Sequence, residues 1–143
     1  MVDEKILEKF KKILHKESLK VTPQRIAVLE EMLKDMGHRE SEEIYFSIKE
    51  QNINVSRATL YRTLDILVQN KFVRKLNLGD GRARYENKVG GHHHDHMICN
   101  SCGLIIEFVD PQIEKLQDVI AEKNKFILTN HIHQLFGICQ DCK

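Results

Sequence analysis

The strongest constraint on this chain is residues 92–102, which read His-His-His-Asp-His-Met-Ile-Cys-Asn-Ser-Cys. Imidazole and carboxylate groups together suit iron, manganese or zinc. The alternatives are a solvated histidine run and a purification tag, but a tag normally sits at a terminus and does not continue into an aspartate and a Cys-x-x-Cys pair. The stretch therefore indicates a metal-binding protein.

An extended segment turns successive side chains to opposite faces. His92, His94 and His96 would then point one way, and His93 and Asp95 the other. We therefore expect this short segment to supply ligands to two separate metal sites.

The four cysteines of the chain form two Cys-x-x-Cys pairs, Cys99 with Cys102 and Cys139 with Cys142. Four thiolates at this spacing close a tetrahedral shell around structural zinc. A disulfide framework would suit a small secreted protein, and a redox site would need only one pair at the start of a helix. Residues 2–5 begin no apolar signal segment. We therefore predict structural Zn²⁺ in a cytoplasmic protein.

The charge of the chain is unevenly distributed, although its formal net charge is only +1. Residues 1–88 carry 18 Lys or Arg and 14 Asp or Glu, whereas residues 89–143 carry 4 and 7. This asymmetry indicates a polyanionic partner for the first part. No apolar run approaches the ~20 residues that span a bilayer, so we expect no membrane contact.

The first part has the pattern of a winged helix-turn-helix domain. Apolar spacing and capping residues predict helices over residues 4–15, from Thr22-Pro23 to about Met36-Gly37, from Ser41 to Gln51, and over 56–68 with Ser56 as the cap. Residues 72–78 and 82–86, separated by Gly-Asp-Gly, predict a basic β-hairpin. The hairpin would lie along the phosphate backbone of DNA as a wing.

The helix over residues 56–68 has the features of a recognition helix. Its exposed first turns carry Arg57, Thr59, Tyr61 and Arg62, which can donate to guanine edges and phosphates or contact thymine methyl groups. The alternative is an ordinary amphipathic helix with solvated arginines. The adjoining basic hairpin favours double-stranded DNA as the partner.

The second part is predicted to be a small α/β domain. Residues 104–109 read as a strand, Asp110-Pro111 as the cap of a helix to about Lys123, and residues 126–138 as a closing strand. About fifty residues form a poor core without a zinc staple or a second subunit. The predicted fold class is thus α+β, with a DNA-binding domain over residues 1–88, a hinge over 87–91, and a zinc-stapled dimerisation domain over 89–143. A homodimer would read a pseudo-palindromic operator, and a tetramer is the alternative.

Several segments together resemble the ferric uptake regulator (Fur) family. They are Lys-Val-Thr-Pro-Gln-Arg at 20–25, Ala-Thr-Leu-Tyr-Arg-Thr-Leu at 58–64, the histidine-rich residues 92–99, and Cys102-Gly103. The resemblance covers nearly the whole chain; Leu60 stands where the family often has valine. Members of the family are dimeric, metal-dependent transcriptional regulators, usually repressors when metal is bound.

The resemblance implies roles for individual residues. The implied sensing site comprises His38, Glu86, His94, His96 and Glu107. The implied accessory site comprises His93, Asp95, Glu114 and His131. Tyr61 and Arg62 resemble the base-reading pair, and Lys20 the lysine that enters the minor groove. His92 and His133 receive no ligand role, and His15 is expected at the surface.

The resemblance implies an Fe(II)-dependent repressor of iron-uptake genes, with Mn²⁺ or Zn²⁺ as alternative regulatory ions. The peroxide-sensing branch tends to have Asp where this chain has Glu86 and Glu107, which favours iron sensing over peroxide sensing. Metal at the sensing site would fix the angle between the two parts, so that the recognition helices of a dimer meet grooves ~34 Å apart. Peroxide, zinc, manganese and nickel sensors of the same family remain alternatives.

A metallohydrolase is the alternative from a different class. Its pattern, His-x-His-x-Asp-His, requires histidine where this chain has Gly91 or Asp95. The pattern fails in either register, so we predict that the chain is not an enzyme.

Overall fold

The computed structural model describes residues 2–90 and 93–143. The chain divides into two compact units, Met1–Gly91 and His92–Lys143, whereas the predicted boundary lies between residues 88 and 89. Gly91 of the predicted hinge and the unassigned His92 lie outside the described residues. Within the described ranges, no helix has the length and apolar character needed to cross a membrane.

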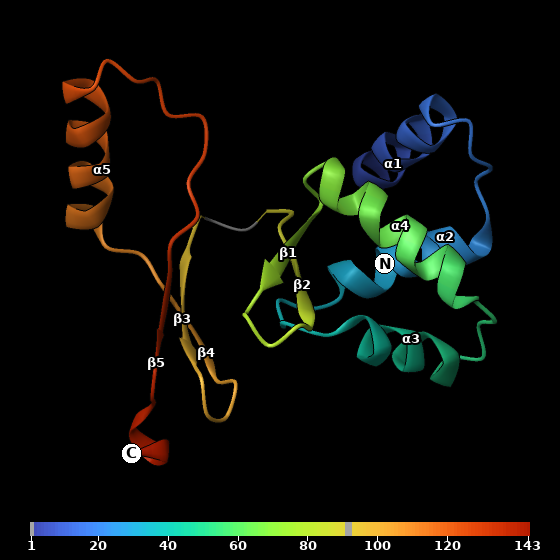
Figure 1. The fold of residues 1–143 in the computed structure, drawn as a ribbon. Coiled ribbons are helices and arrows are strands. Elements are labelled where there is room, and N and C mark those ends of the chain that lie inside the picture. Colours follow the sequence, from blue (N-terminus) through green and yellow to red (C-terminus); the bar gives the residue numbers. More distant parts are fainter. Residues whose placement is uncertain (1, 91–92) are drawn as a thin grey trace. The chain divides into compact units, whose positions relative to one another are not determined.

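The N-terminal unit is helical and ends in a β-hairpin (Figure 1). Its elements are α1 (Glu4–Lys16), α2 (Pro23–Leu33), α3 (Ser41–Glu50), α4 (Arg57–Gln69), β1 (Val73–Asn77) and β2 (Ala83–Asn87). The helices bury a shared core that includes Phe10, Leu14, Leu29, Leu60 and Leu64. The strands pair antiparallel, with Val73 opposite Asn87. The predicted winged helix-turn-helix is confirmed.

Local capping starts two of these helices where the sequence predicts. The Thr22 hydroxyl accepts from the Arg25 N–H at 3.3 Å, and the Ser56 hydroxyl accepts from the Thr59 N–H at 3.1 Å. The predicted Ser41 cap is wrong, because Ser41 is already helical and Glu40 is the N-cap. The Glu43 carboxylate there accepts from the Glu40 N–H at 3.1 Å.

Helix α2 stops at Leu33, before the Met36-Gly37 end that the sequence predicts. After it, Arg39 forms an isolated antiparallel bridge with Tyr85 of β2. The Arg39 N–H donates to the Tyr85 carbonyl at 3.1 Å, and the Tyr85 N–H donates to the Arg39 carbonyl at 2.7 Å. This tertiary pairing requires extended backbone, so the chain leaves the helix early.

The C-terminal unit is a sheet with one α-helix (Figure 1). Its elements are β3 (Asp95–Cys99), β4 (Ile105–Phe108), α5 (Pro111–Lys123), β5 (Gln134–Gly137) and the short 3-10 helix η1 (Gln140–Cys142). The strand order is β4-β3-β5, with β3 antiparallel to β4 and parallel to β5. The Asp110 carboxylate caps α5 by accepting from the Gln112 N–H at 2.8 Å, as predicted.

The predicted strand over residues 126–138 is largely wrong, because only Gln134–Gly137 is a strand. In the parallel pairing Gln134 stands opposite His96, and β3 begins at Asp95, so residues 126–132 have no residue of β3 beside them in this register. Ile127 and Ile132 remain 89% and 81% exposed. The segment instead carries His131 to the side chains of Asp95 and Glu114.

Candidate metal centres

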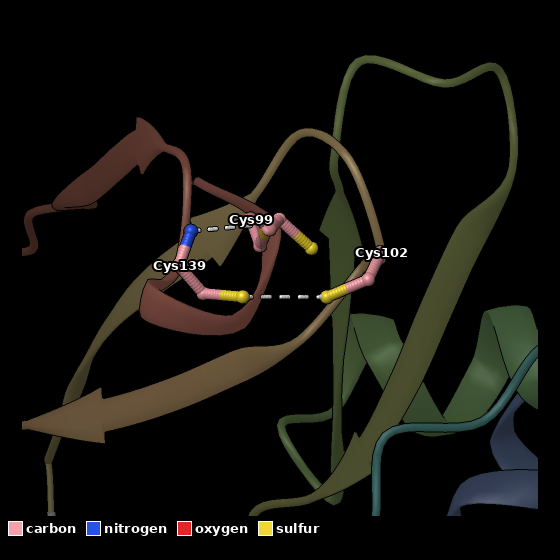
Figure 2. Close-up of side chains that lie close together, drawn as sticks. Cys99, Cys102 and Cys139 are labelled. Atoms are coloured by element: carbon pink, nitrogen blue, oxygen red, sulfur yellow. Dashed lines mark hydrogen bonds between the residues drawn. The ribbon is translucent and has the colours of Figure 1, made fainter.

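The cysteine pairs meet because β3 and β5 run parallel. Each strand is followed by a Cys-x-x-Cys turn, and the ends of parallel strands lie at the same edge of a sheet. The four sulfur atoms lie within 4.8 Å of one another. Figure 2 shows Cys99, Cys102 and Cys139 converging, with the sulfurs of Cys102 and Cys139 3.7 Å apart.

This geometry fits zinc. A tetrahedron with Zn–S bonds of ~2.3 Å has sulfur–sulfur edges of ~3.8 Å, close to the distance between Cys102 and Cys139. The backbone N–H of Cys139 donates to the Cys99 sulfur at 3.3 Å. This bond and one from the Cys102 backbone lower the pKa of Cys99 to about 6, whereas a hydrogen bond with the Cys139 thiol raises the pKa of Cys142 to about 12. The backbone donors thus stabilise a thiolate at Cys99, the form in which cysteine binds metal.

A second cluster lies wholly within the C-terminal unit. It combines His93 and Asp95 with Glu114 from the first turn of α5 and His131 from the segment before β5. The Nε2 atom of His93 lies 3.3 Å from Asp95 Oδ1 and 3.4 Å from Glu114 Oε1. The Nε2 atom of His131 lies 3.5 Å and 3.4 Å from the same two oxygens.

The second cluster also fits a metal ion. Ligand atoms ~2.1 Å from an ion in a tetrahedron are ~3.4 Å apart, which is the spacing found here. Among the described residues, Glu114 Oε1 and His131 Nε2 are buried without a hydrogen-bond partner. Buried polar atoms are costly unless they are satisfied, so the pattern favours a bound ion. The donor set of two imidazoles and two carboxylates suits zinc, iron or manganese.

The described residues of the C-terminal unit hold a third group on the other face of β3. The rings of His94 and His96 lie 4.9 Å apart, and His94 Nε2 lies 3.6 Å from Glu107 Oε1. Glu107 stands opposite His96 in the β3–β4 register, and His96 is 1% exposed. The structure thus groups His94 with His96 and His93 with Asp95, as the strand alternation predicts.

In the N-terminal unit, His38 and Glu86 form a close pair. The distance between His38 Nε2 and Glu86 Oε2 is 2.7 Å, and Arg74 Nε lies 3.7 Å from the other oxygen of Glu86. His38 precedes Arg39 and Glu86 follows Tyr85, so the Arg39–Tyr85 bridge brings the pair together. Imidazole and carboxylate here offer two metal ligands from one unit.

The predicted DNA-contacting residues lie at the start of α4 or before α2. Arg57, Tyr61, Arg62 and Lys20 are exposed, and Thr59 is half-buried. No local pattern indicates that Glu42 of α3 binds two of them. Arg57 donates to both Glu42 oxygens at 3.0 and 3.1 Å, and the Tyr61 hydroxyl donates to Glu42 at 3.2 Å. The Arg57 guanidinium also lies over the Tyr45 ring, 4.3 Å from its centroid.

Acidic side chains also neutralise much of the wing. Arg84 lies 3.0 Å from Asp80 and 3.6 Å from Glu40, and Arg82 lies 3.4 Å from Glu40. The hairpin is therefore less positive than its arginines alone suggest.

Comparisons with known proteins identify the family. The model of the Ferric uptake regulator family matches residues 16–136. The Ferric uptake regulation protein of Campylobacter upsaliensis is 47% identical over 96% of this chain and 88% of that protein. The Helicobacter pylori ferric uptake regulator, whose structure is described as having three functional metal binding sites, is 36% identical with a TM-score of 0.87 over 97% of this chain and 92% of that one.

An iron-bound relative has the same fold. The structure of the ferric uptake regulator from Francisella tularensis with iron is 30% identical, with a TM-score of 0.77 over 87% of this chain and 94% of that one. These matches extend along most of the chain and include both of its units. The chain belongs to the Ferric uptake regulator family.

Proposed function

We propose that this chain is an Fe(II)-dependent repressor of iron-uptake genes, regulated by metal ligands divided between its two units. The observation that carries the proposal is that each unit holds a preformed part of a ligand set. His38 and Glu86 form a pair 2.7 Å apart in one unit, and His94, His96 and Glu107 form a group in the other. His38 and Glu86 offer only two ligands and would bind an ion weakly by themselves. Joint binding of one ion by all five residues would therefore link the units.

The chain's own residues would convert this binding into DNA affinity. The Arg39–Tyr85 bridge fixes His38 and Glu86 to the wing, and β1 follows α4 directly in the chain. Restraining the ligand pair would therefore also restrain the recognition helix. Fe(II), when bound, would supply the bonds that join the units.

The DNA face would comprise the start of α4 together with Lys20 before α2. Tyr61 and Arg62 would read bases, Arg57 and Thr59 would contact base edges or phosphates, and Lys20 would enter the minor groove. All except the half-buried Thr59 are exposed. The partner would be a pseudo-palindromic double-stranded operator, which a twofold-symmetric protein matches.

A second copy of the chain is the partner that the C-terminal unit requires. Ile98, Cys99 and Ala121 are its only buried hydrophobic residues among those described. In contrast, apolar side chains on its strands, on α5 and in the following segment remain exposed, among them Ile106, Leu116, Ile120, Phe126 and Phe136. Exposed apolar area of this kind marks an interface. We propose a homodimer, in the cytoplasm, with a tetramer as the alternative assembly.

The metals would have distinct roles. Zn²⁺ at Cys99, Cys102, Cys139 and Cys142 would be structural, and an ion at His93, Asp95, Glu114 and His131 would be accessory. Mn²⁺ or Zn²⁺ could take the place of Fe²⁺ at the sensing site, because its ligand types suit all three ions. A peroxide, zinc or manganese sensor is the alternative function, with no enzymatic activity in any of these cases.

DNA affinity measured against metal concentration tests the proposal. Zinc-replete protein is titrated anaerobically onto a fluorescent pseudo-palindromic operator with Fe(II), Mn(II) or Zn(II), and anisotropy is recorded. We expect Fe(II) to raise affinity at least about tenfold, a coupling of ~1.4 kcal/mol. His94→Ala should abolish the increase, whereas His15→Ala, an exposed histidine of α1, should retain it.

Two results would contradict the iron proposal. DNA affinity that is independent of all three ions would exclude metal sensing by this chain. A response to Zn(II) or Mn(II) with none to Fe(II), or loss of the Fe(II) response after peroxide at low concentration, would instead assign one of the alternative sensors.

A further inference from the structure

The accessory cluster contains a buried oxygen that its four expected ligands leave unused. Asp95 is 2% exposed. Its Oδ1 atom faces His93 and His131, whereas Oδ2 has no hydrogen-bond partner among the described residues. His133 Nδ1 forms an ion-pair contact with Oδ2 at 3.9 Å, and this nitrogen is likewise buried without a hydrogen-bond partner in the described chain.

The sheet holds His133 beside Asp95. The His96 N–H donates to the His133 carbonyl at 3.2 Å, so His133 meets β3 at the position next to Asp95. On the other side of β3, Phe108 is the register partner of Asp95. The rings of Phe108 and His133 pack edge to face, with their centroids 5.6 Å apart. Backbone pairing and ring packing thus both restrict the position of the His133 imidazole.

We infer that His133 is a positioning residue of the accessory metal site, donating from Nδ1–H to Asp95 Oδ2 while Oδ1 faces the ion. The inference rests on the proposed accessory site. A movement of less than ~1 Å would bring the two atoms within hydrogen-bond distance. Such a bond would satisfy both buried atoms and hold the carboxylate in the orientation that the ion requires.

The arrangement favours positioning over direct ligation. The nitrogen and oxygen atoms of His93, Asp95, Glu114 and His131 lie within 4.8 Å of one another, and His133 is not part of that set. His131 approaches Oδ1 and His133 approaches Oδ2. His131 and His133 therefore contact different oxygens of the Asp95 carboxylate. His131 would lie on the side of the ion, and His133 on the side away from it.

The test is a Co(II) titration of the zinc-replete full-length protein carrying His94→Ala, so that the sensing site does not compete. Absorption bands and calorimetry report the affinity and ligand geometry of the accessory site. We expect His133→Leu to weaken Co(II) binding about 10- to 100-fold and to alter the visible spectrum. The amide of His133→Asn can donate from near the Nδ1 position, so this variant should bind Co(II) with an affinity within about threefold of the parent. A threefold change is well below the loss expected when the hydrogen bond is removed.

Controls separate this inference from the proposed site itself. Asp95→Asn should remove the accessory Co(II) signal, and His15→Leu should leave it unchanged. If Asp95→Asn removes the accessory Co(II) signal but His133→Leu binds Co(II) like the parent, the accessory site stands and the positioning role of His133 is wrong. Equal weakening by His133→Leu and His133→Asn, with equal loss of thermal stability, would assign His133 a packing role only. A Co(II) titration unaffected by Asp95→Asn would overturn both the site and the inference.

Discussion

Glu42 shows how a single residue can modulate the proposed DNA face. Its carboxylate accepts from Arg57 and Tyr61, and the hydrogen bond from Arg57 lowers the pKa of Glu42. The Arg57 and Glu42 side chains are 51% and 45% exposed, so the pair is solvated and weak enough for a phosphate to displace. In the proposed DNA complex, a phosphate would nevertheless have to compete with Glu42 for Arg57.

We predict that Glu42→Gln strengthens binding to non-specific duplex DNA. An arginine released to contact phosphate should steepen the slope of log K against log salt concentration by ~0.9 per protomer. Anisotropy titrations across a salt series measure both effects. Glu50→Gln, an exposed carboxylate on the same helix, controls for the change in net charge. Equal slopes for the two variants would show that Glu42 does not restrain Arg57.

For single residues, the sequence predicts those positions that follow directly from backbone geometry, such as which side chains share one face of a strand. Strand alternation alone is enough to separate His93 and Asp95 from His94 and His96. The Glu42–Arg57 pair and the approach of His133 to Asp95 join different helices or strands. Their contacts depend on helix packing and strand register, which local patterns do not specify.

At the scale of elements, a buried carboxylate fastens α2 to its neighbours. Glu31 accepts from Arg39 at 2.7 Å, from the Ser47 hydroxyl, and from the Gln51 amide at 2.8 Å. Burial raises the pKa of Glu31, but the hydrogen bonds from these three residues outweigh it and hold the pKa below its usual 4.5. The ionised form is therefore stabilised in the folded state.

We predict that Glu31→Gln lowers the free energy of unfolding by about 2 kcal/mol at pH 7, because charged hydrogen bonds in a buried network are lost. A depressed folded-state pKa adds stability above the unfolded pKa, and this stability is lost as pH falls through the folded value. The difference from the parent should therefore shrink as pH falls below about 4.5. Urea unfolding followed by the helical circular dichroism signal measures it at each pH. Glu30→Gln, which is exposed, should match the parent, and a deficit constant down to pH 3 would contradict the mechanism.

The ends of helices and strands also have either local or tertiary causes, and the sequence reveals only the local ones. Thr22, Ser56 and Asp110 are caps that the sequence reveals, since each bonds a backbone N–H within three residues. The early end of α2 depends on the bridge between Arg39 and Tyr85. The short last strand likewise depends on its parallel register with β3, which begins at Asp95 and places His96 opposite Gln134. Neither long-range pairing leaves a local pattern.

At the scale of the whole molecule, we expect the proposed dimer to depend on the cysteine cluster. The C-terminal unit buries few apolar side chains of its own and exposes many that a second copy would cover. The four cysteines connect the turn after β3 to the end of the chain after β5. Zinc there would hold the turn between β3 and β4 against the segment after β5. The exposed apolar face of the sheet would thereby be stabilised, because metal-binding energy contributes directly to folding.

We therefore predict that Cys102→Ser lowers both zinc content and dimer affinity. Cys102 is exposed, so serine costs little packing and the effect should come from the incomplete metal shell. Elemental analysis should find one zinc per chain in the parent and little in the variant, and sedimentation should show at least about a tenfold weaker dimer, equivalent to ~1.4 kcal/mol. Asn100→Ala, in the same turn but without a thiol, should retain zinc and dimer. A zinc-free variant that stays fully dimeric at nanomolar concentration would show that the sheet forms its interface without a metal staple.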